Sequence, residues 1–146
     1  MAECLWDGFE LLFRSLLASL LLEDACPPGS VVDAGAQKGH EACLFASSSR
    51  ERRVHAIDPS VENVRSIRSR YGHRANLRAV QGALAERPAQ GLPDEGPHRQ
   101  VQRVHTKRSR ARRIENASSY DVWTLDDLFG ERGEWSGEAL GLLHLE

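Results

Sequence analysis

Apolar side chains recur at helical spacing at the start of the chain and in short runs after it. From Leu5 to Leu22 they fall three or four positions apart with charged side chains between them, which predicts one amphipathic helix. Two prolines in the segment Cys26–Gly29 end this helix, because proline lacks the amide proton that a helix needs. Residues 1–29 are therefore expected to be a helix and a Pro-Gly linker, with the helix packed on the sheet of the following domain.

The rest of the chain alternates between segments with the patterns of strands and of helices. Strands are expected at 30–34, 53–57, 77–80 and 139–145, and helices from the glycine turn 35–39 through Phe45 and at 61–71. Such alternation is typical of an α/β domain with a parallel sheet, whose ligands bind at the carboxyl ends of the strands. The apolar run at 139–145 suits a buried central strand.

The segment between the third and fourth of these strands is mostly polar. Residues 86–100 are rich in proline, glycine and charge, and they are expected to be an irregular connection. Tyr120–Trp123 is expected to be a short extended piece, followed by a helix at Leu125–Phe129. Thr124 can cap that helix, and Asp126 and Asp127 favour its first turn without any catalytic role.

Composition and charge narrow the class of protein. The length of 146 residues suits one domain, 40% of the side chains are hydrophobic, and the formal net charge of -2 gives no overall attraction to nucleic acid. The three cysteines form no close pair, so we expect a reducing, cytoplasmic environment without a disulfide framework or zinc site. The apolar run Leu16–Leu22 is far short of the ~20 residues that span a membrane, so no span is expected.

Residues 99–113 carry seven basic side chains and no acidic one. Such a patch can grip phosphates, but it has no aromatic residue on which a base could stack. We favour a solvated loop, or an edge strand whose charges prevent pairing with another chain, over a nucleic-acid site.

The candidate chemistry lies in the glycine turn and at the end of the second strand. Gly35 and Gly39 let a ligand approach the backbone closely, and the following helix points free N–H groups at an anionic group. Asp58 follows Gly39 by nineteen positions, where a carboxylate can accept hydrogen bonds from both ribose hydroxyls. Because Gln37 stands where a dinucleotide motif has its middle glycine, S-adenosylmethionine is favoured over NAD.

These residues resemble the FkbM-type S-adenosylmethionine-dependent methyltransferases. The matching segments follow in the same order along residues 30–146, and they are Val31–Gly39, Val54–Asn63, Val80–Ala85, Val122–Leu128 and Leu142–Glu146. This chain has Gln37 where the family usually has Asn, Asp58 where it has Glu, and His144-Leu145-Glu146 where it has Lys-Ile-Asp. The resemblance implies a Rossmann-like class I methyltransferase fold, with its parallel sheet truncated after the fourth strand.

The resemblance also implies a function and a set of site residues. The chain would bind S-adenosylmethionine and transfer its methyl group to a hydroxyl oxygen of a small-molecule acceptor or sugar. No metal is implied and no catalytic base is assigned. The expected cofactor-binding residues are Asp33, Gly35, Ala36, Gln37, Gly39, Asp58, Pro59, Gln81, Gly82, Ala83 and Glu146.

Three other interpretations stay open at this stage. The chain could be a truncated member that binds the cofactor without catalysis, a nicotinamide-dependent oxidoreductase, or a nucleic-acid binder that uses its basic segment. The oligomeric state and the methyl acceptor are not predicted.

Overall fold

The computed structural model describes residues 2–23, 25–86, 89–92, 103–105 and 120–145. Within these residues the helices are α1 (Ala2–Leu22), α2 (His40–Ser48), α3 (Val61–Tyr71) and α4 (Leu125–Phe129). The strands are β1 (Ser30–Ala34), β2 (Val54–Asp58), β3 (Leu77–Leu84), β4 (Ala89–Leu92), β5 (Arg103–His105), β6 (Tyr120–Trp123) and β7 (Leu140–Leu145).

The described strands form one sheet in the order β5-β4-β6-β3-β2-β1-β7. The strands β6, β3, β2, β1 and β7 are parallel to their neighbours, whereas β4 pairs antiparallel with both β5 and β6. The predicted α/β class with a parallel sheet is confirmed, and the arrangement is consistent with a Rossmann-like fold. A sheet of only four strands was wrong, because β6 adds a fifth parallel strand and β4 and β5 add an antiparallel pair.

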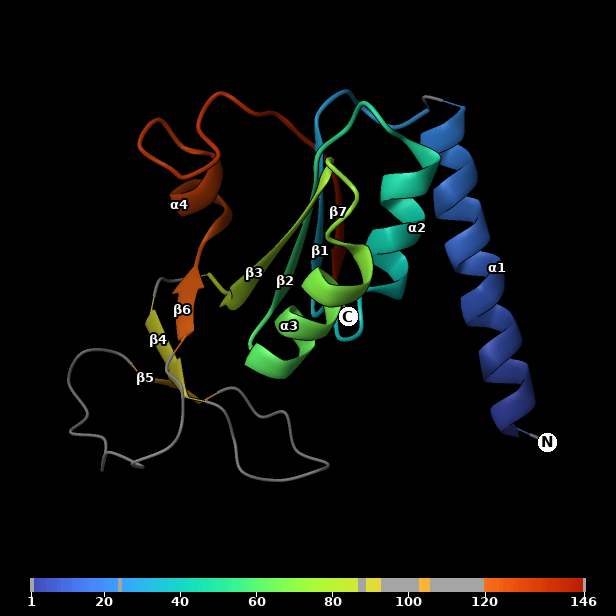
Figure 1. Ribbon diagram of the computed structural model, residues 1–146, viewed down its shortest axis with the longest axis horizontal. Coiled ribbons are helices and arrows are strands. Elements are labelled where there is room, and N and C mark those ends of the chain that lie inside the picture. The colour runs from blue at the N-terminus through green and yellow to red at the C-terminus, as the bar shows by residue number, and fades with distance from the viewer. Residues whose placement is uncertain (1, 24, 87–88, 93–102, 106–119, 146) are drawn as a thin grey trace.

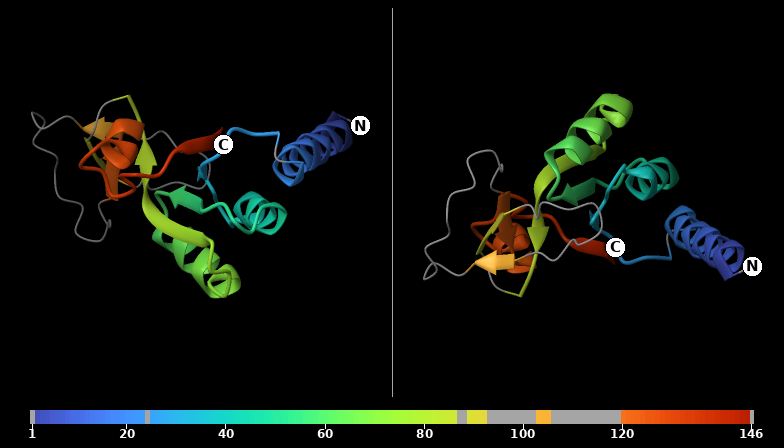
Figure 2. Two further views of the ribbon diagram at one scale, coloured as in Figure 1. Left: turned by 90° about the horizontal axis from the view of Figure 1, so that it is seen from above. Right: turned by 90° about the horizontal axis from the view of Figure 1, so that it is seen from below.

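The helices lie in layers on the two faces of the sheet. Figure 2 shows α2 and α3 on one face and the short helix α4 on the other. Alternate side chains of each strand serve these two layers, as the period of two along a strand requires. Val31 belongs to the same core cluster as Phe45 of α2 and Ile67 of α3, while Val32 belongs to a second cluster with Leu128 of α4 and Trp135.

Helix α1 extends the layer formed by α2. Its C-terminal half lies beside α2 (Figure 1), and its Arg14 Nε lies 2.6 Å from Oε1 of the buried Glu41. Leu21 reaches the core, but Leu12 and Leu16 are more than half exposed. The predicted helix is confirmed. Its contact with the sheet lies at the edge strand β7, where the ring centroids of Phe13 and His144 are 6.5 Å apart, because α2 and α3 cover the strands β1 to β3.

Three expectations about the strands need correction. β3 runs to Leu84 rather than Val80, so Gln81–Ala83 belong to the strand and do not follow it. β4 replaces part of the irregular connection expected at 86–100. β7 lies at an edge of the described sheet, beside β1 alone, rather than at its centre.

The basic segment 99–113 is described only at Arg103–His105. These three residues form β5, an edge strand, which agrees with one of the two structures expected for them. The remaining positions of the segment lie outside the described residues. Among the helices that the structure describes, none has the length and apolar character needed to cross a membrane.

Candidate site at the carboxyl edge of the sheet

The glycine turn after β1 is held against the end of β2. The backbone N–H groups of Gly35 and Ala36 both donate to the carbonyl oxygen of Ile57, at 2.9 and 3.1 Å. Gly35, Gln37 and Gly39 have φ angles of 89°, 44° and 76°, in the left-handed region that glycine adopts without strain. The tight turn expected between β1 and α2 is therefore present.

Gly39 is needed for packing as well as for its φ angle. It is the N-cap of α2, and a Cβ atom at this position would lie 2.7 Å from Cγ1 of Ile67 in α3. A side chain here would push α2 and α3 apart. The absence of a Cβ at Gly39 thus serves the contact between two helices, whereas at Gly35 it serves the turn.

Asp58, at the end of β2, holds the glycine turn through its side chain. Oδ2 accepts a hydrogen bond from the backbone N–H of Gln37 at 2.8 Å, although the two residues are 21 positions apart. Oδ1 accepts from the backbone N–H of Ser60 at 2.8 Å and from Nδ2 of Asn63 at 3.0 Å. One carboxylate therefore connects β2, the turn after β1 and the start of α3.

These contacts determine how many acceptor positions of the Asp58 carboxylate remain available to a ligand. The residue is 2% exposed, and three of roughly four acceptor positions on its two oxygens are occupied. Burial raises the pKa of Asp58, and the hydrogen bonds from Ser60, Asn63 and Gln37 oppose that rise. A ribose that used both hydroxyls would have to displace one of the protein's donors, whereas one hydroxyl could use the free position on Oδ2.

Two further predicted residues, Pro59 and Gln81, lie beside Asp58. Gln81 pairs with Asp58 in the register between β3 and β2, and its Nε2 donates to the carbonyl oxygen of Pro59 at 3.2 Å. Gly82 and Ala83 lie further along β3, where they pair with β6. The ring of Trp123 fills the space beside Gly82, since a Cβ there would lie 2.1 Å from Cζ3.

Asp33 lies within the core next to this edge. It is fully buried, and its Oδ1 is 2.7 Å from Nδ1 of His144 on β7. Its Oδ2 is buried without a hydrogen-bond partner. Phe45 meets the ring of His144 edge-on, with 5.6 Å between the ring centroids. The contact between Asp33 and His144 therefore connects the neighbouring strands β1 and β7.

The remaining predicted residues are placed as follows. Ala36 is buried in the turn, and the side chain of Gln37 is exposed at its tip. Glu146 lies outside the described residues. Two cavities lie at the amino ends of the strands, one where β2 and β3 begin and one where β1 and β7 begin, and neither is lined by a residue of the glycine turn.

The structure also identifies two residues that the sequence analysis did not select. Ser60 and Asn63 hold the carboxylate of Asp58, and Ser60 also caps α3 by accepting from the N–H of Asn63. The signal was present, because an Asp that accepts from the N–H two positions later is a common turn and serine is a preferred N-cap.

No group of three possible metal ligands occurs among the described residues. A comparison of the chain with protein-family models gives no match, and a comparison with curated proteins gives none either.

Proposed function

We propose that this chain binds S-adenosylmethionine at the carboxyl edge of its sheet and transfers the methyl group to a hydroxyl oxygen. The observation that carries the proposal is the hydrogen bond from Gln37 N–H to the carboxylate of Asp58. It brings the glycine turn and the acidic end of the next strand, which are the two sequence signals for this cofactor, into one site.

Different residues at this edge suit the methionine, ribose and adenine parts of the cofactor. The backbone at Gly35 and Gln37, together with the free N–H groups at the start of α2, suits the carboxylate of the methionine part. The free acceptor position on Asp58 suits one ribose hydroxyl. Within the segment Gln81–Ala83, the half-buried Gln81 is assigned to the adenine, because Gly82 and Ala83 are buried.

Methyl transfer from this cofactor requires few catalytic side chains. The sulfonium of the cofactor is the leaving group, so the electron pair of the breaking C–S bond stays on sulfur while the acceptor oxygen forms the new C–O bond. The protein contributes by holding donor and acceptor in line, and a base is needed only to remove the hydroxyl proton. None of the residues described at this edge is assigned as that base.

Binding without methyl transfer is a second candidate. It is favoured by the position of β7 at the edge of the described sheet, where His144 of this strand is half-buried and Leu145 is exposed. Leu12, Phe13 and Leu16 on α1 are also exposed. The described residues thus leave apolar surface of β7 and α1 open to solvent instead of enclosing an acceptor with it.

Thermal unfolding of the 146-residue chain with added ligand tests the binding. S-adenosylmethionine should raise the melting temperature, because a ligand at a hundred times its Kd stabilises the folded state by about 2.7 kcal/mol. NAD should leave it unchanged. Asp58→Asn should reduce the shift measured from the variant's own melting temperature, while Asp126→Asn, at an exposed acid on α4, should preserve it.

The outcomes separate the candidates. Absence of any shift with S-adenosylmethionine in a folded chain, or an equal shift with NAD, would overturn the proposal. A shift that depends on Asp58, without transfer of a labelled methyl group to any hydroxyl acceptor tried, would support binding without catalysis.

A further inference from the structure

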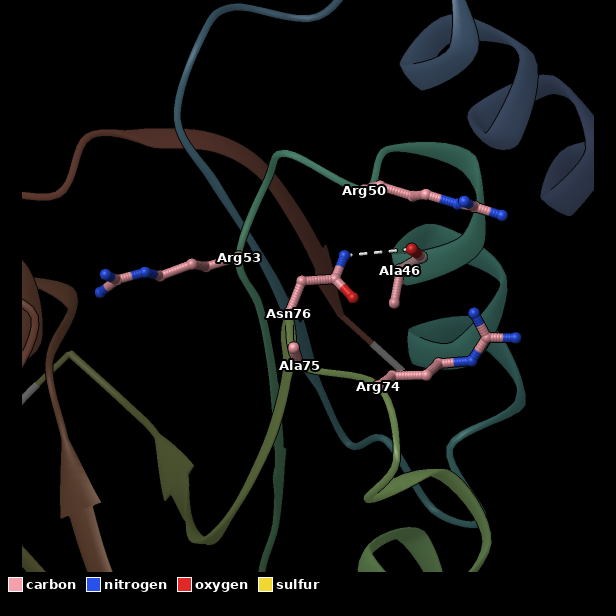
Figure 3. A pocket seen from close by; sticks show the side chains of 6 residues that line it. All are labelled: Ala46, Arg50, Arg53, Arg74, Ala75 and Asn76. Atoms are coloured by element: carbon pink, nitrogen blue, oxygen red, sulfur yellow. Dashed lines mark hydrogen bonds between the residues drawn. The ribbon is translucent and has the colours of Figure 1, made fainter.

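A cavity lined by arginine side chains lies at the opposite edge of the sheet. This cavity of about 460 Å³ opens where β2 and β3 begin, beside the last turn of α2 (Figure 3). It is lined by Ala46, Arg50, Arg53, Arg74, Ala75 and Asn76. Since the carboxyl and amino ends of parallel strands lie at opposite edges, this cavity is separate from the proposed cofactor site.

The charge of this cavity is entirely positive. Three guanidinium groups line it and no carboxylate does. Arg53 is already paired, because its Nη1 lies 2.5 Å from Oε1 of Glu138, and in Figure 3 its side chain extends away from Arg50 and Arg74. The side chains of Arg50 and Arg74 reach to the same side and have no hydrogen bond or ion pair within the described part of the chain.

Arg74 carries the clearest sign of a missing partner. Its Nε is buried from water and donates to no acceptor. A buried donor of a charged group without an acceptor is costly, and such groups in native proteins usually have a bound water or ion as partner. A ligand that brings an acceptor oxygen to Nε would remove this cost.

The nearby backbone carbonyls do not meet this need. At the carboxyl end of α2 the side chain of Asn76 already donates from Nδ2 to the oxygens of Ala46, Ser49 and Arg52, at 3.0, 3.2 and 3.1 Å. This amide satisfies the negative end of the helix. The two unpaired guanidinium groups are therefore left to attract an anion from solution.

We propose that this cavity binds a small organic phosphate, with its phosphate group held by Arg50 and Arg74. The planar guanidinium fork of arginine matches two phosphate oxygens and forms short, charge-assisted hydrogen bonds. A volume of about 460 Å³ exceeds the need of a bare phosphate and falls within the usual ~300–1,000 Å³ of small-molecule sites. The methyl groups of Ala46 and Ala75 offer an apolar wall to the organic part. This proposal does not depend on S-adenosylmethionine binding.

Calorimetric titration of the 146-residue chain with phenyl phosphate tests the site. The wild-type chain should bind phenyl phosphate more tightly than inorganic phosphate or benzoate at the same ionic strength. Arg74→Gln and Arg50→Gln should each weaken binding about tenfold, as expected for the loss of one charge-assisted hydrogen bond. Arg65→Gln, an exposed arginine of α3 outside the cavity, is the matched control and should have no effect.

Two results would overturn the proposal. One is that the wild-type chain does not bind phenyl phosphate. The other is that Arg65→Gln weakens binding as much as the cavity variants do, which would indicate attraction to net charge alone. Benzoate that binds as tightly as phenyl phosphate would overturn the choice of phosphate. Because Arg50 is exposed, its variant keeps the test decisive if Arg74→Gln does not fold.

Discussion

The imidazole of His55 on β2 stacks on the indole of Trp135, with 3.8 Å between the ring centroids and 19° between the ring planes. Trp135 belongs to the segment between α4 and β7, and it is 2% exposed. His55 is also 2% exposed, and its Nε2 lies 2.9 Å from Oε2 of Glu138, while its buried Nδ1 has no hydrogen-bond partner. The contact fixes this segment on the face of the sheet opposite α2 and α3.

We expect Trp135→Ala to destabilise the fold by about 3–5 kcal/mol, the usual cost of truncating a buried tryptophan. Trp135→Phe should cost less than half as much, because the buried Nε1 of Trp135 has no hydrogen-bond partner to lose. Urea unfolding followed by circular dichroism measures both values. Equal losses for the two variants would show that the indole does not stabilise the fold through its size.

The contact between Asp33 and His144 makes a second prediction. Asp33→Ala leaves a half-buried imidazole without its carboxylate partner, and we expect a loss of about 3 kcal/mol. His144→Ala should lose at least as much, because it leaves the fully buried carboxylate of Asp33 without its imidazole partner, and the double variant should be more stable than the sum of the two losses implies. A double-mutant cycle in urea measures this coupling, and strict additivity would contradict it.

Local patterns account for most of what could be predicted. The turn at Gly35 and the capping of α4 by Thr124 depend on residues a few positions apart, so the sequence indicates them directly. The structure confirms a capping box at Thr124, whose side chain accepts from the N–H of Asp127 while that carboxylate accepts from the N–H of Thr124. The alternation of apolar strands and amphipathic helices likewise predicted the α/β class.

Contacts between distant segments account for what was missed. The residues Asp33 and His144 are 111 positions apart, and no local pattern specifies that β1 and β7 are neighbours. Strand β4 has the sequence Ala-Gln-Gly-Leu, which has weak strand preference and forms a strand because β5 and β6 pair with it on both sides. The place of α1 depends on which surface α2 leaves open, which is a property of the assembled fold.

A third prediction concerns Gly82, whose missing side chain makes room for β6. An added Cβ would lie 2.1 Å from Cζ3 of Trp123 and 2.9 Å from the carbonyl oxygen of Asp121. Gly82→Ala should therefore destabilise the fold by about 1–3 kcal/mol, the usual cost of overpacking. In a chain that already carries Trp123→Leu, Gly82→Ala should cost less stability than it does in the wild-type chain. Thermal unfolding of Gly82→Ala, Trp123→Leu and the double variant measures this difference, and an equal cost in both chains would exclude Trp123 as the cause.

The last prediction follows from the pKa of Glu138. Burial would raise this pKa, but hydrogen bonds from Ser30, His55 and Arg53 outweigh it and lower the pKa from 4.5 to about 2. The folded state thus prefers the ionised carboxylate more strongly than the unfolded state does. Its contribution to stability is fully present above about pH 4.5 and is lost as the pH falls from there toward 2.

Replacement of this carboxylate should remove that dependence on pH. Glu138→Gln should be less stable than the wild-type chain at pH 6, and the difference in free energy of unfolding should shrink at pH 3, where the wild-type carboxylate has lost most of its advantage. Urea unfolding at both pH values measures the difference. The control is Glu131→Gln, at an exposed acid four positions before Trp135. Its free energy of unfolding should differ from that of the wild-type chain by the same small amount at pH 6 and at pH 3. A gap between wild-type and Glu138→Gln that stays constant with pH would mean that Glu138 stabilises the fold through shape rather than charge.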